Sequence, residues 1–557
     1  MHIHAPPPST PFASGSPRFN TAVADAMSAW RQVYEAQGPR CAAEVGGEFA
    51  VALDLPAGGQ YLAVDRFAVH SLCYAHHEGR LHFATRADVL ARRLGITEID
   101  TQAVFDYLFH HCIPSPRTIY AGIKRLPAGH YALLEQGRLT VAPYWLPRFE
   151  EASSPDFNAL REEFRDILRR SVKERLSSQG STACFLSGGT DSSTVCGLLR
   201  DVTGQAPASY SIGFEAEGYD EMEYARIAAR AFQAEHHEYY ITPADLVKAI
   251  PTVAAHYDQP FGNSSALPAF YCASQARADG HARMLAGDGG DELFGGNTRY
   301  AKERIFDVYQ HLPTPLRRGL LDPLFANSVT ARIPLLKKGS SYIRQARVPM
   351  PDRTQQYNLL DRLGLQTIFT REFLARVNIE APREHQRATW AAGPQDSILV
   401  NQMLAFDWRY TLAENDLPKV VGTTALADID VSFPLLDTRL LDFSLKIPTH
   451  YKLKGLKLRW FFKEALRGFL PDEILTKKKH GFGLPFGPWA VKDAALFALA
   501  AESLRSIAAR GIVRQEFVET LLTQKLKEHA GFYGEMVWIL MMLEQWLQHH
   551  APEYRVS

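Results

Sequence analysis

The sequence has no excess charge of either sign and no long hydrophobic run. Lys+Arg and Asp+Glu both number 61, so the formal net charge is zero. A chain without a basic field has no general attraction for nucleic acid or for an anionic membrane surface. The apolar run from Met536 to Leu543 is too short to cross a bilayer, and it predicts part of a buried helix. We therefore expect no nucleic-acid partner and no membrane partner.

Cysteine is scarce, and its placement indicates neither a disulfide framework nor a zinc site. The six cysteines include no CxxC pair and no Cys/His spacing suited to zinc. We expect them to be small apolar residues inside a protein from a reducing compartment. They are Cys41, Cys73, Cys112, Cys184, Cys196 and Cys272.

The first residues, MHIHAPPPSTPFASGSPRF, lack the basic segment and apolar core of a secretory signal. Their proline and serine content predicts a flexible leader over residues 1–20. Because no targeting segment is recognised, we expect the protein to be cytoplasmic.

Two regions of different character follow the leader. From residue 45 to 145, short apolar stretches are broken by glycine, proline and polar turns, with one helical patch at 101–110. This pattern predicts a small β-rich domain over residues 21–150. From residue 157 onward, apolar strands alternate with helical segments, and 295–530 is mostly helical. The alternation predicts an α/β fold over residues 155–557, with a parallel sheet, flanking helices and a helical C-terminal part.

The segment ACFLSGGTDSSTVCGLL places a glycine turn between a predicted strand and a predicted helix. Glycines let the backbone approach an anion closely, and a helix start offers unpaired N–H groups and a positive dipole end. Asp191 would repel phosphate unless a cation lay between them, so Mg²⁺ is implied. The loop is not a Walker A sequence. It predicts a phosphate site formed by Ser187, Gly188, Gly189, Asp191, Ser192 and Ser193.

This loop resembles the SGGxDSS pyrophosphate loop of the N-type ATP pyrophosphatases, which cleave ATP to AMP and pyrophosphate. Together with SIGFEAEGYDEMEYARIAARAF and LAGDGGDELFGG, it makes residues 157–545 similar to the synthetase domain of the asparagine synthetase superfamily. Relatives in that superfamily include β-lactam synthetase and the lasso-peptide cyclases. The resemblance implies their HUP-like sheet, with ATP and Mg²⁺ bound, and an adenine contact at Ile212, together with Leu186 and Gly287.

Two more motifs carry implied roles. LAGDGGDELFGG resembles the family's SGEGSDExFGG and places Asp291 on its second Mg²⁺ ligand. Asp191 and Asp291 would then hold an ion that neutralises the leaving pyrophosphate. The segment KGLKLRWFFKEALRGFLPDEILTKKKHGFGLP places Lys479 at the family's lysine position, where it would stabilise charge as the adenylate forms.

Several candidate catalytic residues lie at positions where the family has polar groups. Asp288 and Asp430 replace family glutamates, and they are candidates for amine positioning and proton transfer. The alternative is that they form hydrogen bonds to the residues that contact the substrate. Lys419 keeps the family's lysine and is a third candidate. Gly422 and Ser432 stand where the family has arginines. Their loss removes partners for an amino-acid carboxylate and weighs against free aspartate as the substrate.

The β-rich region resembles part of another known domain. GEFAVALDL, LAVDRFAVHSLCY and IYAGIKRLPAGHYALL are similar to the second half of a class II glutaminase domain. In that family a catalytic Cys follows Met directly and uses its own α-amino group as base. Here His2 follows Met1. We expect a shortened domain without the nucleophile that takes ammonia from glutamine.

Three hypotheses remain open. The first is an ATP-dependent ligase that forms an acyl-adenylate and passes it to an amine carried by its small-molecule or peptide substrate, as lasso-peptide cyclases do. A precursor peptide, a processing protease and a homodimer are partners that this hypothesis allows. The second is an asparagine synthetase-like enzyme that uses free or partner-supplied ammonia. The third is a non-catalytic nucleotide-binding paralogue, against which the intact SGGTDSS and GDGGDE motifs argue.

Overall fold

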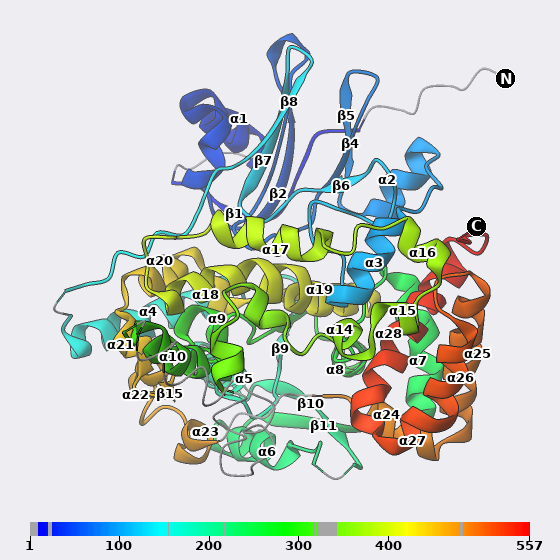
Figure 1. Cartoon of the computed structure of the whole chain (residues 1–557). Coiled ribbons are helices and arrows are strands. Elements are labelled where there is room, and N and C mark those ends of the chain that lie inside the picture. Colours follow the sequence, from blue (N-terminus) through cyan, green and yellow to red (C-terminus); the bar gives the residue numbers. More distant parts are fainter. Residues whose placement is uncertain are drawn as a thin grey trace.

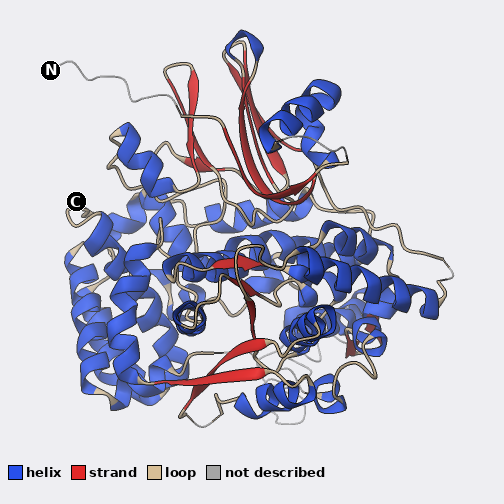
Figure 2. Ribbon diagram, turned by 180° about the vertical axis from the view of Figure 1, so that it is seen from behind, coloured by secondary structure: helices blue, strands red, loops and turns tan. Residues whose placement is uncertain are grey.

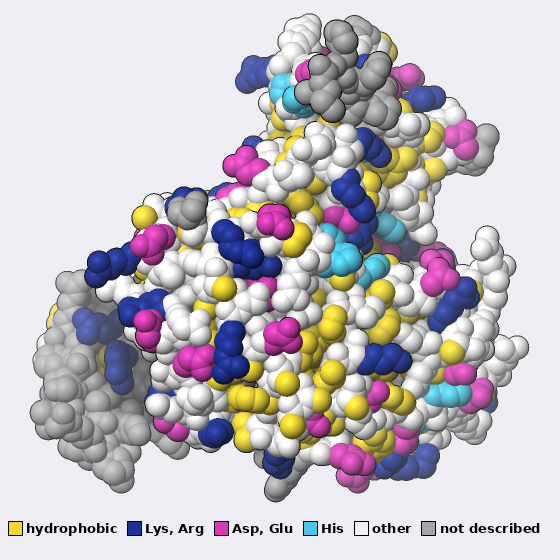
Figure 3. All heavy atoms as spheres, turned by 90° about the vertical axis from the view of Figure 1, so that its right-hand side faces the viewer, with side chains coloured by type: hydrophobic (Ala, Val, Ile, Leu, Met, Phe, Trp, Pro, Cys, Tyr) yellow, Lys and Arg dark blue, Asp and Glu magenta, His cyan; other side chains and the backbone are white. Residues whose placement is uncertain are grey.

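The computed structural model describes residues 9–20, 25–153, 155–216, 218–313, 315, 319, 342–477 and 483–556. Antiparallel sheets from the N-terminal region lie on top of a larger body, in which helices surround a parallel sheet (Figure 1, Figure 2). Basic and acidic side chains are interspersed on the face that Figure 3 shows. The arrangement confirms the predicted α/β class with a β-rich N-terminal region.

Two antiparallel sheets form the N-terminal region: one of five strands in the order β1-β2-β3-β7-β8, and one of three in the order β5-β4-β6. Residues 12–18, predicted to belong to a flexible leader, instead pair with β2, from Phe12 opposite Ala52 to Arg18 opposite Gly46. Pro17 is tolerated there because β1 is an edge strand. The elements are β1 (Phe12–Arg18), β2 (Gly46–Asp54), β3 (Gln60–Val64), β4 (Cys73–His77), β5 (Arg80–Ala84), β6 (Lys124–Arg125), β7 (His130–Glu135), β8 (Arg138–Pro143), α1 (Ala26–Gln37), α2 (Ala87–Leu94) and α3 (Thr101–His110).

The body is built on a five-stranded sheet in the order β11-β10-β9-β12-β13, and every neighbouring pair in it is parallel. The loops that follow β9, β10 and β12 meet at one edge, the carboxyl edge, where open α/β sheets bind their ligands. Its elements are β9 (Thr182–Phe185), β10 (Ala208–Phe214), β11 (Glu235–Ile241), β12 (Arg283–Leu285), β13 (Asp430–Ser432), α4 (Phe157–Glu174), α5 (Thr190–Thr203), α6 (Met222–Ala231), α7 (Pro243–His256), α8 (Ala266–Ala278), α9 (Gly290–Phe294) and α10 (Thr298–His311).

Helices make up most of the rest of the body. The last one, α28 (Ala530–His550), buries the whole run from Met536 to Leu543, as the sequence predicts. No helix in the described part of the chain is long and apolar enough to cross a membrane. The remaining elements are α14 (Leu359–Leu363), α15 (Leu365–Ile368), α16 (Arg371–Ala375), α17 (Ala381–Ala391), α18 (Leu399–Asp407), η6 (Trp408–Asp416), α19 (Leu417–Leu426), α20 (Thr438–Lys446), α21 (Thr449–Lys452), β14 (Leu453–Lys454), β15 (Lys457–Leu458), α22 (Trp460–Ala465), α23 (Asp472–Thr476), α24 (Phe486–Lys492), α25 (Ala494–Ala509), α26 (Gln515–Thr520), η8 (Leu521–Lys525) and α27 (Leu526–Glu528).

Buried polar contacts join the N-terminal region to the body. Arg125, from β6, forms an ion pair with Glu414 of the π-helix η6, and Ser115 Oγ donates to the same carboxylate at 2.5 Å. The last residue of η6, Asp416, lines the main cavity of the body. The N-terminal region therefore braces the segment that carries part of the cavity wall.

Candidate functional site

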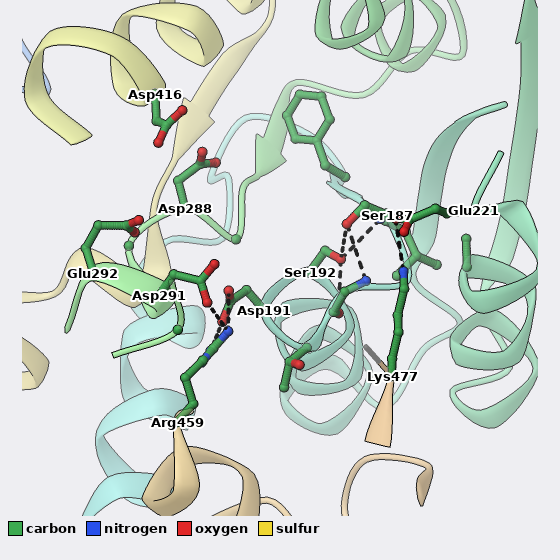
Figure 4. A pocket seen from close by; sticks show the side chains of 18 of the residues that line it. Ser187, Asp191, Ser192, Glu221, Asp288, Asp291, Glu292, Asp416, Arg459 and Lys477 are labelled. Carbon is green, nitrogen blue, oxygen red and sulfur yellow. Dashed lines mark hydrogen bonds and ion pairs between the residues drawn. The ribbon is translucent and has the colours of Figure 1, made fainter. Parts of the chain in front are cut away.

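A cavity of about 1000 Å³ lies at the carboxyl edge of the parallel sheet. Loops after β9 and β12, the start of α5, the helix α19 and the segment around α22 supply its walls (Figure 4). The structure brings ten of the predicted site residues to this cavity: Leu186, Ser187, Gly189, Asp191, Ser192, Ile212, Gly287, Asp288, Asp291 and Lys419.

The predicted phosphate loop lies between β9 and α5. Ser187 Oγ is 3.0 Å from Ser192 Oγ, and the backbone N–H of Ser187 donates to the same hydroxyl at 3.1 Å. Gly188 has φ +67°, and a Cβ there would lie 2.4 Å from the backbone of Ala225, so only glycine fits. The loop thus holds the start of α5 open toward the cavity, where its N–H groups can bind an anion.

Two residues predicted for this loop do not line the cavity. The carbonyl oxygen of Gly188 accepts a bond of 3.4 Å from Lys477 Nζ. Ser193 lies in the first turn of α5 with its side chain fully buried. Their contribution is to the shape of the loop, and no cavity contact is assigned to either.

The predicted adenine contacts form an apolar part of the wall. Leu186 and Ile212 line it together with Pro268 and Ala269 of α8. A Cβ at Gly287 would lie 2.8 Å from the backbone nitrogen of Ser192, so this glycine allows the loop after β12 to pack against the start of α5. This apolar part of the wall suits a flat base beside a phosphate-binding loop.

Asp191 and Asp291 face each other across the guanidinium of Arg459 (Figure 4). One guanidinium nitrogen donates to Asp191 Oδ2 at 2.8 Å and to Asp291 Oδ1 at 2.6 Å, and the other nitrogen contacts Asp191 Oδ1. Arg459 is buried, and the two carboxylates raise its pKa above the ordinary value even though burial lowers it.

The donor set of this acidic pair fits Mg²⁺ bound with a nucleotide. Mg²⁺ takes one or two carboxylates and completes its shell with water and phosphate oxygens. In the described part of the chain, no group of three or more His, Cys, Asp or Glu side chains is placed to hold a metal by itself. Asp191 and Asp291 would be the protein ligands, at the position that Arg459 now fills.

A second charged group lies on another wall of the cavity. Lys419 Nζ is 3.5 Å from Asp288 Oδ1 and 3.6 Å from Asp416 Oδ1. Burial lowers the pKa of Lys419, but the two carboxylates raise it above its ordinary value, so the lysine keeps its charge. Burial, with help from Asp291 and Asp416, raises the pKa of nearby Glu292 and favours its protonated form. This wall carries two carboxylates against one cation, which suits an amine.

One predicted catalytic residue lies away from the cavity, and another lies outside the described residues. Asp430 is the first residue of β13, opposite Arg283 in β12, so it lies at the amino edge of the sheet. Its side chain is 73% exposed and pairs with Arg283 at 3.4 Å. The structure therefore does not bring Asp430, which is predicted for proton transfer, to the cavity. Lys479 lies outside the described residues.

Residues that the sequence does not predict also line the cavity. Arg459 is the cation between the predicted metal ligands, and Asp416 is the second carboxylate beside Lys419. Lys477 forms an ion pair of 3.1 Å with Glu221 at the rim (Figure 4). Arg459 stands in the matched segment KGLKLRW, but nothing in its spacing predicts a meeting with residues far away in the sequence.

All six cysteines are buried and unpaired. Cys41 belongs to the N-terminal region, where its Sγ lies 3.4 Å from the hydroxyl of Tyr61. Burial raises the pKa of its thiol to about 11. A thiol with so little thiolate is a poor nucleophile. The thiol of Cys41 is therefore not activated for glutamine hydrolysis.

The loop at the start of α5, the acidic pair and the Asp288–Lys419–Asp416 group share one cavity, an arrangement that an ATP-dependent ligase could use. Comparison with known families agrees with this class. The asparagine synthase family model matches residues 163–548, and the glutamine amidotransferase domain model matches residues 25–145. The chain therefore belongs to the asparagine synthase family, and its class is that of ATP-dependent carbon–nitrogen ligases.

Individual relatives carry related names. The chain is 24% identical over 495 residues to asparagine synthetase (glutamine-hydrolyzing) 1 of Bacillus subtilis, covering 87% of this chain and 74% of that protein. It is 26% identical over 520 residues to a putative asparagine synthetase (glutamine-hydrolyzing) of Mycobacterium bovis, covering 90% and 76%. It is 23% identical over 517 residues to amidase chry2 of Gibberella zeae, covering 82% and 72%.

Proposed function

We propose that the chain activates a carboxylate as an acyl-adenylate and passes the acyl group to an amine. The observation that carries the proposal is the single cavity that joins the phosphate loop and Asp191–Asp291 pair to the Asp288–Lys419–Asp416 group. Its volume of about 1000 Å³ lies at the upper end of the range of about 300–1,000 Å³ for small-molecule sites. This leaves room for a nucleotide and a second substrate.

The first step forms a bond between a substrate carboxylate oxygen and the α-phosphorus of ATP, and breaks the bond from that phosphorus to the bridging oxygen. Pyrophosphate leaves with the electron pair. The start of α5 and the hydroxyls of Ser187 and Ser192 hold phosphate oxygens. Mg²⁺, held by Asp191 and Asp291, would neutralise the charge that develops on pyrophosphate.

In the second step the amine nitrogen attacks the acyl carbon, and AMP leaves as the amide bond forms. The ammonium form of the amine is attracted to the Asp288–Lys419–Asp416 wall and loses one proton to water to become the nucleophile. Asp288 accepts the second proton, which the nitrogen loses as the amide forms. Lys419 orients Asp288 through their 3.5 Å contact. Holding both reactants in one cavity supplies much of the rate.

The amine is proposed to come with the substrate, as in macrolactam or peptide-modifying amide formation. The burial of all six cysteines supports this choice, because a buried structural thiol is a poor nucleophile. A side chain at position 422 has no room, because its Cβ would lie 2.4 Å from the ring of Tyr257. The ring of Tyr257 therefore packs against Gly422, and this position supplies no cation for the carboxylate of free aspartate.

An ammonia-using asparagine synthetase-like enzyme is the second candidate. The names of the bacterial relatives favour it, since they are asparagine synthetases. A nucleotide-binding paralogue without activity is the third. It would have no need for both a metal pair and a proton acceptor in the same cavity.

Product analysis by mass spectrometry distinguishes these candidates. The protein is incubated with ATP, Mg²⁺ and aspartate, and either ammonium or glutamine is added. We expect no asparagine with glutamine and, if the amine belongs to the substrate, none with ammonium. AMP together with asparagine in the ammonium sample would support the second candidate and contradict substrate-borne amine. A second incubation replaces aspartate with a peptide that carries both a carboxylate and an amine, and its decisive positive result is AMP together with the loss of one water from the peptide.

A further inference from the structure

We propose that Arg459 is a built-in substitute for the metal ion, which holds the Asp191–Asp291 pair together until metal and nucleotide bind and displace it. The inference rests on the proposed nucleotide site and does not depend on which acid or amine is used. It assigns to Arg459 two partners in turn: the two carboxylates first, and a nucleotide phosphate afterwards.

Three separate elements of the fold bring Asp191, Asp291 and Arg459 into contact. Asp191 comes from the start of α5, Asp291 from α9, and Arg459 from the residue before α22. Two glycines leave the space that the carboxylates of Asp191 and Asp291 occupy beside Arg459. A Cβ at Gly290 would lie 2.1 Å from Asp191 Oδ1, and a Cβ at Gly296 would lie 1.7 Å from Asp291 Oδ1.

The backbone of Arg459 is strained. Its backbone has φ +54° and ψ 37°, a left-handed conformation that is costly for a residue with a side chain. It directly follows the short hairpin of β14 and β15, which has two paired positions and carries the exposed Leu456 at its turn. Leu456, Lys457 and Leu458 all line the cavity, so a ligand in the cavity touches this hairpin.

Charge explains why a substitute is needed. Two carboxylates in a half-buried site repel each other unless a cation lies between them. The guanidinium supplies one positive charge, whereas a divalent ion supplies two and holds carboxylates at shorter range. Once displaced, the guanidinium still needs an anionic partner. A phosphate oxygen pair matches its planar fork.

The exchange predicts that metal and nucleotide bind together. Metal alone must displace a tethered guanidinium that gains no new partner, so its binding is weak. With a nucleotide present, the guanidinium moves to a phosphate, and both ligands bind more tightly. The competing account is that Arg459 stays where it is as a purely structural ion pair and that no metal enters between the carboxylates.

The test measures Mn²⁺ binding by electron paramagnetic resonance, with and without the analogue α,β-methylene-ATP. Wild type is expected to bind Mn²⁺ weakly alone and tightly with the analogue. Arg459→Met is expected to bind Mn²⁺ alone about tenfold or more tightly than wild type, since no guanidinium competes. In this variant the analogue should increase the Mn²⁺ affinity much less than it does in wild type. Mn²⁺ should also raise the unfolding temperature of Arg459→Met more than that of wild type.

Arg510→Met is the matched control, because Arg510 forms a buried ion pair with Glu544 away from the cavity. It should lose stability and keep wild-type Mn²⁺ binding. Arg459→Lys keeps one positive charge without the fork, and an intermediate Mn²⁺ affinity is expected. Equal Mn²⁺ affinity in wild type, Arg459→Met and Arg459→Lys would overturn the substitute role while leaving the proposed function standing if the analogue still binds wild type. No binding of Mn²⁺ and analogue to any variant would overturn both.

Discussion

Lys419 and Asp288, which are far apart in the sequence, lie 3.5 Å apart on the cavity wall, and Asp416 contacts the same ammonium group at 3.6 Å. Lys419 comes from the start of α19 and Asp288 from the loop after β12. The contact links the sheet edge to the π-helix η6, which the N-terminal region holds through Arg125 and Glu414. The N-terminal region thus contacts the helix that carries Asp416, one of the three residues of this wall.

Replacing Lys419 by Met is expected to lower both stability and activity. Without the ammonium group, Asp288 and Asp416 repel each other and lose a charged hydrogen bond, which costs about 1–3 kcal/mol in the free energy of unfolding. Urea unfolding measures this loss, and pyrophosphate release measures the activity. Lys492→Met, on the exposed side of α24, is the control and should change neither. Unchanged activity in Lys419→Met would remove this lysine from the site.

Asp191→Asn is expected to reduce pyrophosphate release by about a hundredfold or more, because the metal loses one of its two carboxylates. Asp430→Asn is the comparison variant. Asp430 is 73% exposed at the other edge of the sheet, so the Asp430→Asn variant should release pyrophosphate at a rate within about twofold of wild type. A strong loss of rate in Asp430→Asn would restore the role that the sequence predicts for it.

The six cysteines are expected to be unreactive in the folded protein, because all are buried and burial raises the pKa of the Cys41 thiol to about 11. A chromogenic disulfide reagent should detect no fast thiol in the native protein and all six after denaturation. Glutamine alone should yield no glutamate. One fast thiol whose alkylation stops glutamate formation would show that a glutaminase reaction does occur.

Lys452 should make stability depend on pH. It is fully buried, and burial lowers its pKa to about 7, although Glu151 opposes this shift. The unfolded chain keeps this proton up to about pH 10.4. Between these values the unfolded state binds more protons than the native state, so this group makes stability rise with pH, by up to about 1.4 kcal/mol per pH unit.

Lys452→Met removes that dependence. The free energy of unfolding of Lys452→Met, relative to that of wild type, should be highest at pH 7 and below, and this difference should shrink toward pH 10. Urea unfolding at several pH values measures the difference. Lys446→Met, exposed on α20, should keep the wild-type slope. If the free energy of unfolding changes with pH in the same way in wild type and in Lys452→Met, Lys452 is charged in the native protein.

The phosphate loop could be predicted from sequence because its chemistry is local. Strand, glycine turn and helix start follow one another along ACFLSGGTDSS, and the structure brings Ser187, Asp191 and Ser192 together at the cavity as the sequence predicts. Asp430 could not be placed in the same way. A motif match does not reveal which end of a strand a residue occupies, and the pairing of Asp430 with Arg283 puts it at the amino edge.

Contacts between distant segments were the part that could not be predicted. Arg459 meets Asp191 and Asp291 only because a hairpin and two helix starts converge, and no spacing in the sequence encodes that meeting. Residues 12–18 contain Gly, Ser and Pro, which favour a flexible segment locally. Pairing with β2 at the sheet edge overrides that preference.

The most direct test of the proposed ligase site is calorimetric binding of α,β-methylene-ATP. Wild type should bind the analogue in Mg²⁺ and lose most of the affinity in a chelator, whereas Asp191→Asn should bind weakly under both conditions. Asp430→Asn should behave as wild type does. Binding that ignores Mg²⁺, or that survives unchanged in Asp191→Asn, would contradict the assignment of this cavity as a magnesium–ATP site.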